Sequence, residues 1–194
     1  MAAMTEKNLL SVDWSTIPAP ADDGAAAHLS GASVPPVALP ATDGTSVVLS
    51  SLKGRIVVFA YPRTGQPGKA SLVNDWDVIP GARGCTPQTC SFRDLFADLK
   101  RAGAQGVFGL STQSIAYQRE MVERLHVPFA VLSDEKLELT RAMRLPTMQV
   151  AGQTLIKRLA LVIDDGRITR VFYPVFPPDR NAGDVLAWLQ ANSR

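Results

Sequence analysis

Residues 81–94 read GARGCTPQTCSFRD and contain both cysteines of the chain, Cys85 and Cys90. Glycines lead up to Cys85, Thr86 can cap a helix, and Pro87 suits a first helical turn. Apolar side chains then recur at helical spacing at Leu95, Phe96 and Leu99. The stretch therefore predicts a helix that begins at Cys85 and runs on through these positions.

A thiol at a helix start lies near backbone N–H groups without partners and near the positive end of the helix dipole, and both favour the thiolate. Arg83 adds a positive charge nearby. We therefore interpret Cys85 as a nucleophile. The alternative is that one or both cysteines only fill space in the core. A metal site fits the sequence less well, because the C-x₄-C spacing supplies only two sulfur ligands.

The spacing of the two cysteines restricts how they can react with each other. Positions i and i+5 of a helix lie about 7.5 Å apart along the axis and roughly 140° apart in rotation. A disulfide needs Cα atoms within about 4.4–6.8 Å of each other and Cβ atoms that face each other. Cys85 and Cys90 can therefore bond only if the first turns unwind. This behaviour is typical of a catalytic disulfide, in which a sulfenic acid condenses with a second thiol.

A continuous β-branched and aromatic run at residues 55–61 precedes the cysteines and predicts a central strand that is buried on both faces. Pro62 ends this strand, and a long loop with several glycines and prolines, residues 63–84, leads to Cys85. The thiol is thus expected outside the carboxyl end of a strand, where open α/β sheets place their sites.

The rest of the chain alternates strands and helices. Asp43-Gly44 and Asp164-Asp165-Gly166 predict hairpin turns. Further strands are expected at 37–39, 47–49, 106–111, 129–132, 159–163 and 168–173, with helices at 114–125 and 135–143 and a closing helix capped by Asn181. The pattern predicts an α/β fold with a central mixed sheet and helices on both faces.

The composition fits one globular domain. The chain has 194 residues, of which 46% are hydrophobic and 20% charged, with a net charge of +2 and no basic tract that would indicate nucleic-acid binding. We expect an N-terminal arm and connector at residues 1–33 and a single domain at 34–194. The sequence shows no apolar run long enough to span a membrane and no secretory signal, so a cytoplasmic protein is expected.

Two further residues are candidates for the site. Arg158 directly precedes the predicted strand 159–163, and a fixed guanidinium there could pair with the thiolate and stabilise charge on a leaving oxygen. The alternative is a solvated cation at a strand edge, and Lys157 is a weaker candidate for the same role. Thr64 could hydrogen-bond near the sulfur, although a loop threonine is often only a turn residue.

Together these residues resemble the peroxiredoxins, closest to the bacterioferritin-comigratory-protein (Q-type) branch. The segments that carry the resemblance are 61–62, 84–94, 107–112, 128–129, 132–134 and 158–164. The resemblance implies a thioredoxin fold and reduction of hydroperoxides at the expense of thioredoxin, with no metal, flavin or nucleotide. It also implies that Cys85 is the peroxidatic cysteine, Cys90 the resolving cysteine and Arg158 the active-site arginine.

The sequence departs from this family at one position. Members usually carry a threonine or serine three residues before the peroxidatic cysteine, whereas this chain has Ala82 there and an enlarged loop at 63–84. Thr64 is the candidate replacement for that hydroxyl. Two other functions stay open: a peroxide-sensing or partner-binding redox switch, and a thiol–disulfide oxidoreductase, which would usually carry C-x-x-C. A monomer and a homodimer are both compatible with the sequence.

Overall fold

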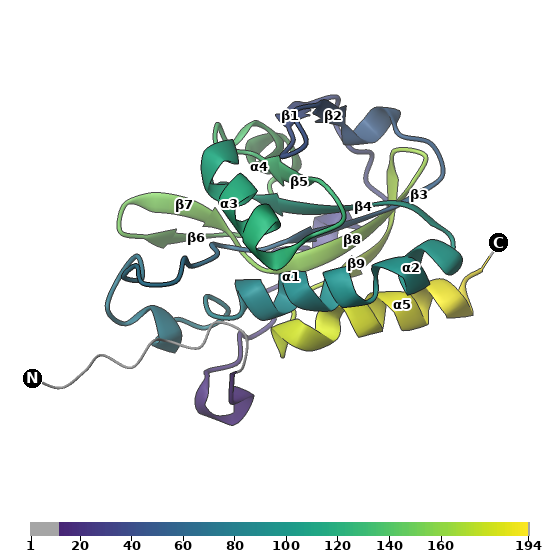
Figure 1. Ribbon diagram of the computed structural model, residues 1–194. Helices are drawn as coiled ribbons and strands as arrows, with labels where there is room; N and C mark the ends of the chain where they lie inside the picture. Colours follow the sequence, from purple (N-terminus) through teal and green to yellow (C-terminus); the bar gives the residue numbers. More distant parts are fainter. Residues whose placement is uncertain (1–11, 194) are drawn as a thin grey trace, which may run out of the picture.

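The computed structural model describes residues 12–193 (Figure 1). Its strands are β1 (Ala38–Pro40), β2 (Ser46–Val48), β3 (Arg55–Ala60), β4 (Ala104–Ser111), β5 (Val131–Ser133), β6 (Thr147–Val150), β7 (Gln153–Ile156), β8 (Leu159–Asp164) and β9 (Arg167–Phe172). Its α-helices are α1 (Cys85–Asp94), α2 (Phe96–Arg101), α3 (Ile115–Leu125), α4 (Glu138–Met143) and α5 (Asn181–Ala191). Short 3₁₀ helices include η1 (Trp14–Thr16), η4 (Trp76–Val78) and η5 (Pro178–Arg180).

A five-stranded mixed sheet with the order β5-β4-β3-β8-β9 forms the centre of the molecule. Strand β3 pairs parallel with β4 and antiparallel with β8, and all six of its residues are buried. This confirms the central strand that the apolar run predicts. The chain leaves β3 at Pro62 and returns to the same end of the sheet at Cys85.

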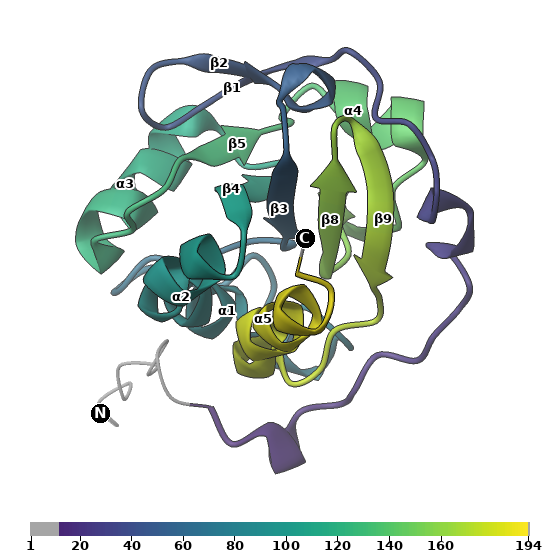
Figure 2. The same ribbon diagram turned by 90° about the vertical axis from the view of Figure 1, so that its right-hand side faces the viewer.

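Helices cover both faces of this sheet, as predicted. Alternate residues of β3 point into two separate cores, because successive side chains of a strand face opposite ways. Val57 and Phe59 pack with side chains of α1, α2 and α5, whereas Ile56 and Val58 pack with the β1–β2 hairpin and α4. Figure 2 shows α1, α2 and α5 together on one side of the sheet and the hairpin and α4 on the other.

The two predicted hairpins are present. Strands β1 and β2 pair antiparallel around Asp43 and Gly44. Strands β8 and β9 join through Asp165 and Gly166, both with positive φ, as a two-residue hairpin turn requires. A third hairpin, β6–β7, was not predicted from the sequence. It packs Val150 and Leu155 against Trp76 and Ala82 of the 63–84 loop, and so supports the segment that leads to Cys85.

Three local expectations were wrong. The helix that begins at Cys85 does not run through Leu99, because Leu95 separates α1 from α2. Thr86 does not cap α1: Gly84 is the N-cap residue, with φ +105°, and Thr86 is buried inside the helix. Asn181 does not cap α5 but is its first residue, and its side chain faces the core.

The N-terminal segment packs along the domain. Ala26 and Leu29 are buried in the same core as β3, so residues before 34 contribute to the folded body. The division at residue 34 otherwise stays a prediction, and residues 1–11 of the predicted arm lie outside the described residues. Within residues 12–193, no helix has the length and apolar character needed to cross a membrane.

Candidate active site

Cys85 lies at the first position of α1, and only 2% of it is exposed. The helix is held on the sheet by Phe92, whose ring stacks on Phe59 of β3 at a centroid distance of 4.1 Å and an angle of 5°. This contact holds α1, about two turns after Cys85, against the carboxyl end of β3. The Cys85 thiol lies 3.6 Å from the carbonyl oxygen of Ala82.

Arg158 is buried beside the sulfur. Its Nη2 lies 3.3 Å from Sγ of Cys85, and only 2% of the residue is exposed. The same nitrogen donates to three carbonyl oxygens of the segment before the cysteine, at 3.3, 3.3 and 3.0 Å for Gly81, Ala82 and Arg83. Its Nε has no hydrogen-bond partner among the described residues. The guanidinium therefore ties strand β8 to the start of α1 and carries its charge to the thiol.

Two further polar side chains, Gln88 and Asn181, extend the hydrogen bonds of Arg158 away from the thiol. The sequence did not indicate either of them as a site residue. Nη1 of Arg158 donates to Oε1 of Gln88, and Nε2 of Gln88 donates to Oδ1 of Asn181 at 2.9 Å. Both side chains are at most 1% exposed. Asn181 accepts a hydrogen bond from the amide nitrogen of Gln88. This fixes the orientation of the Gln88 amide, so that its oxygen points toward Arg158. A polar residue three positions after Cys85 is the only sequence signal for this arrangement, and Asn181 lies far away in the chain.

We expect Asn181→Leu to lower kcat/KM for hydroperoxide by about 5- to 10-fold, the effect of weakening one hydrogen bond of ~1 kcal/mol. Gln88 would lose the acceptor that orients its amide, and Arg158 would be held less firmly. Asn181→Asp keeps an acceptor and should restore most of the rate. Asn192→Leu, just after the last turn of the same helix, is the matched control, and an equal loss in that variant would point to a general effect on α5 instead.

Thr64 is buried near Cys85, but its hydroxyl is already engaged. Its Oγ1 donates to Oε1 of Gln113 at 3.1 Å, and its backbone N–H donates to the same oxygen at 2.9 Å. The Tyr117 hydroxyl donates to the Thr64 carbonyl oxygen at 3.1 Å. Thr64 and Cys85 line the same small cavity, of about 60 Å³. The structure thus brings the two residues to one cavity, with Gln113 and Tyr117 fixing the threonine.

The other predicted cations are engaged elsewhere. Arg83 forms an ion pair with Asp77 at 2.5 Å, and Lys157 forms one with Asp23 at 2.6 Å. Arg158 is the cation whose guanidinium contacts the Cys85 sulfur. The structure therefore favours Arg158 over Lys157 for the role beside the thiol.

Cys90 is half-buried on the intact helix α1, and neither cysteine is in a disulfide. Burial raises the pKa of the Cys90 thiol above its ordinary value; the nearby Arg93 opposes this shift. In the folded helix Cys90 is therefore mostly a thiol at neutral pH. Bonding to Cys85 requires α1 to unwind, as the spacing of the cysteines predicts.

Alkylation measures this shift directly. In a Cys85→Ser variant Cys90 is the single thiol, and we expect its rate of reaction with iodoacetamide to rise with pH. The midpoint should lie above that of free cysteine, because only the thiolate reacts. The denatured variant, in which the burial is lost, should show the ordinary midpoint. Equal midpoints in the two states would contradict the effect of burial.

Residues 29–186 match the Redoxin family. Peroxiredoxin Bcp of Escherichia coli is 30% identical over 169 residues, which cover 84% of this chain and 97% of the relative. The chain belongs to the peroxiredoxins, in the Q/Bcp branch. Peroxiredoxin Q of rice, named as chloroplastic, is 32% identical over 163 residues, which cover 83% of this peroxiredoxin and 66% of the relative. The chain therefore spans slightly less than two thirds of that plant protein.

Solved structures agree on the fold of this peroxiredoxin. The crystal structure of BcpB from Mycobacterium tuberculosis is 28% identical and superposes with a TM-score of 0.66, covering 84% of this chain and 96% of the other. Peroxiredoxin Q from Xanthomonas campestris, at 23% identity, has a TM-score of 0.64 over 81% of this chain and 92% of the other. These matches confirm the predicted thioredoxin-like fold.

Proposed function

We propose that the chain is a thiol-dependent peroxidase that reduces hydrogen peroxide and organic hydroperoxides. The observation that carries this proposal is the 3.3 Å contact between the buried Arg158 guanidinium and Sγ of Cys85 at the start of α1. Cys85 attacks the O–O bond as a thiolate. One oxygen stays on sulfur as a sulfenic acid, and the other leaves with a proton as water or an alcohol.

Arg158 stabilises the negative charge on sulfur before the reaction and on the leaving oxygen during it. A guanidinium suits this role because it stays protonated and has several donors in one plane. Burial of Arg158 strengthens the interaction, since little water competes for the charge. Thr64 has the role of fixing the cavity wall beside the sulfur, which is supported by its contacts to Gln113 and Tyr117.

Cys90 resolves the sulfenic acid. Once the first turns of α1 unwind, the Cys90 sulfur displaces the hydroxyl from Cys85, and a disulfide and water form. A dithiol protein of the thioredoxin class then reduces this disulfide in two exchange steps and is itself oxidised. The C-x₄-C spacing supports this order of events, because the two thiols cannot bond while the helix is intact.

The test is peroxide-dependent oxidation of NADPH by the purified chain with thioredoxin and thioredoxin reductase. We expect steady turnover with wild type, and a single fast oxidation without turnover by thioredoxin in Cys90→Ser. One stoichiometric oxidation of wild type, with no further NADPH use, would favour the redox-switch function over the peroxidase. Slow reaction of both thiols with peroxide would exclude both.

The cytoplasmic location expected from the sequence stays a prediction, and several plant relatives are named as chloroplastic. The state as monomer or homodimer also stays a prediction.

A further inference from the structure

The cavity at Cys85 is partly walled by a segment that precedes the family match. Residues 12–28 of the N-terminal arm lie before residue 29, where the match to the Redoxin family begins. Val12 of this arm lines the cavity together with Leu72 and Trp76 of the 63–84 loop and Tyr117 of α3. The walls around the thiol therefore come from the arm and the enlarged loop as well as from the core of the fold.

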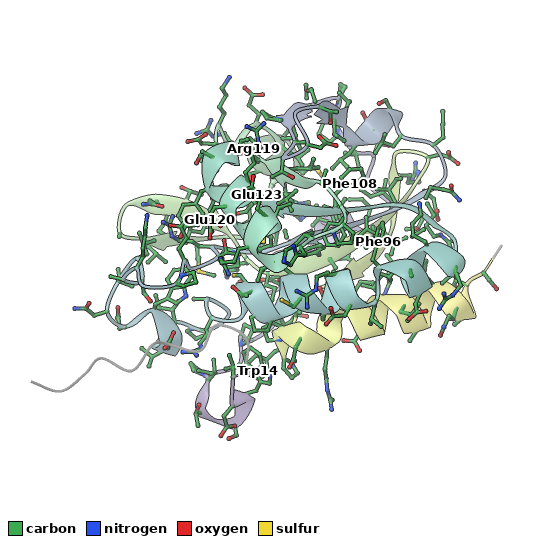
Figure 3. All side chains as sticks on the ribbon, viewed as in Figure 1. Trp14, Phe96, Phe108, Arg119, Glu120 and Glu123 are labelled. Carbon is green, nitrogen blue, oxygen red and sulfur yellow. The ribbon has the colours of Figure 1, made fainter. Side chains whose placement is uncertain are left out.

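Trp14 attaches the arm to the segment between β9 and α5. Its indole Nε1 donates to Oδ2 of Asp179 at 2.8 Å, and its ring meets Phe176 edge-on at a centroid distance of 6.0 Å. Figure 3 shows Trp14 on the arm, below the first turns of α1 and α5. Trp14 is thus held by one hydrogen bond and one aromatic contact to the segment that leads into α5.

The segment before Cys85 is shaped to receive the arm. A Cβ atom on Gly84 would lie 2.7 Å from Cη2 of Trp14 and 2.6 Å from Cγ of Pro178, distances that side chains do not tolerate. A Cβ on Gly81 would lie 3.6 Å from Pro20, further along the same arm. The arm therefore follows the 81–84 segment closely at both glycines, and its position beside the thiol is a packed contact.

The size of the cavity limits what can reach the sulfur. A volume of about 60 Å³ holds roughly four to six water-sized molecules, at about 10–15 Å³ for each. Hydrogen peroxide, with two oxygen atoms, needs the space of about two such molecules, whereas the aromatic cumene hydroperoxide is several times larger. Since Cys85 is buried, a substrate that does not fit must displace part of the wall.

From these contacts we propose that the N-terminal arm, anchored by Trp14, is a specificity element that restricts this peroxidase to small hydroperoxides. The inference rests on the proposed peroxidase activity and adds its substrate class. The arm acts through Val12, which lines the cavity, while Trp14 positions the arm and does not itself line the cavity. Weakening the anchor should open the cavity to bulkier peroxides and leave hydrogen peroxide turnover largely intact.

The experiment measures kcat/KM for cumene hydroperoxide and for hydrogen peroxide in wild type, Trp14→Ala and Asp179→Ala, the last of which removes the acceptor of the Trp14 hydrogen bond. We expect the ratio of cumene hydroperoxide to hydrogen peroxide to rise at least about fivefold in both variants. Ser15→Ala on the same arm, whose hydroxyl bonds within the arm to Asp13, is the matched control and should keep the wild-type ratio.

A ratio within twofold of wild type in both variants, with hydrogen peroxide turnover retained, would overturn the arm's role and leave the peroxidase standing. A wild-type enzyme that already prefers cumene hydroperoxide would overturn the substrate class. Absence of turnover with every peroxide in wild type would instead overturn the proposed function, so the two failures are distinguishable.

Discussion

Cys85→Ser is expected to abolish peroxide reduction, with kcat/KM lowered by at least about 10⁴-fold, as when other enzymes lose their nucleophile. A serine hydroxyl occupies almost the same space but does not ionise at neutral pH, so no anion is available to attack the O–O bond. The fold should persist, since the introduced serine would still lie at the first position of α1 beside Arg158. Coupled NADPH oxidation and direct peroxide consumption both measure this loss.

Two controls accompany this variant. The thermal unfolding midpoint should stay within a few degrees of wild type, which separates loss of chemistry from loss of structure. Cys90→Ser should retain the first oxidation of Cys85, seen by trapping the sulfenic acid with dimedone, while losing recycling by thioredoxin. If Cys85→Ser kept peroxide turnover and Cys90→Ser lost the first oxidation, the roles of the two cysteines would be reversed.

Local sequence patterns predicted the strands and turns because they depend on neighbouring residues. The apolar run of β3 forms a strand, and the glycines of the β1–β2 and β8–β9 turns adopt positive φ, as their residue types favour. The β6–β7 hairpin was missed because its turn residue Ala151 has a positive φ of 49°, which an alanine does not signal. In that case packing against Trp76 and Ala82 prevails over local preference.

The site was predictable to the extent that its residues carry their chemistry in their type and position. Cys85 at a helix start and Arg158 beside a buried strand were both predicted as site residues. In the structure Nη2 of Arg158 lies 3.3 Å from Sγ of Cys85. Gln88 and Asn181 were not, because an amide has many ordinary roles and their contact spans 93 positions of the chain. The contact of Trp14 with the segment before Cys85 depends on tertiary packing in the same way.

The loss expected for Arg158→Met is the second largest, about 10²- to 10³-fold in kcat/KM, the range for removing a donor that stabilises a developing anion. Methionine fills much of the same volume but leaves the Cys85 sulfur and the Gln88 amide oxygen without the guanidinium.

Arg158→Lys separates charge from geometry. A single ammonium group keeps the charge but cannot reach Gln88 and the sulfur with separate nitrogens, so an intermediate rate is expected. Arg170→Met, at an exposed position of β9 where the guanidinium lies over Phe172, is the control for general loss of an arginine and should keep the wild-type rate. If Arg158→Met, folded as judged by circular dichroism, reacted with peroxide as fast as wild type, the charge on Arg158 would have no part in the chemistry. The buried guanidinium would then serve only to hold the 81–83 segment against β8 through its three carbonyl contacts.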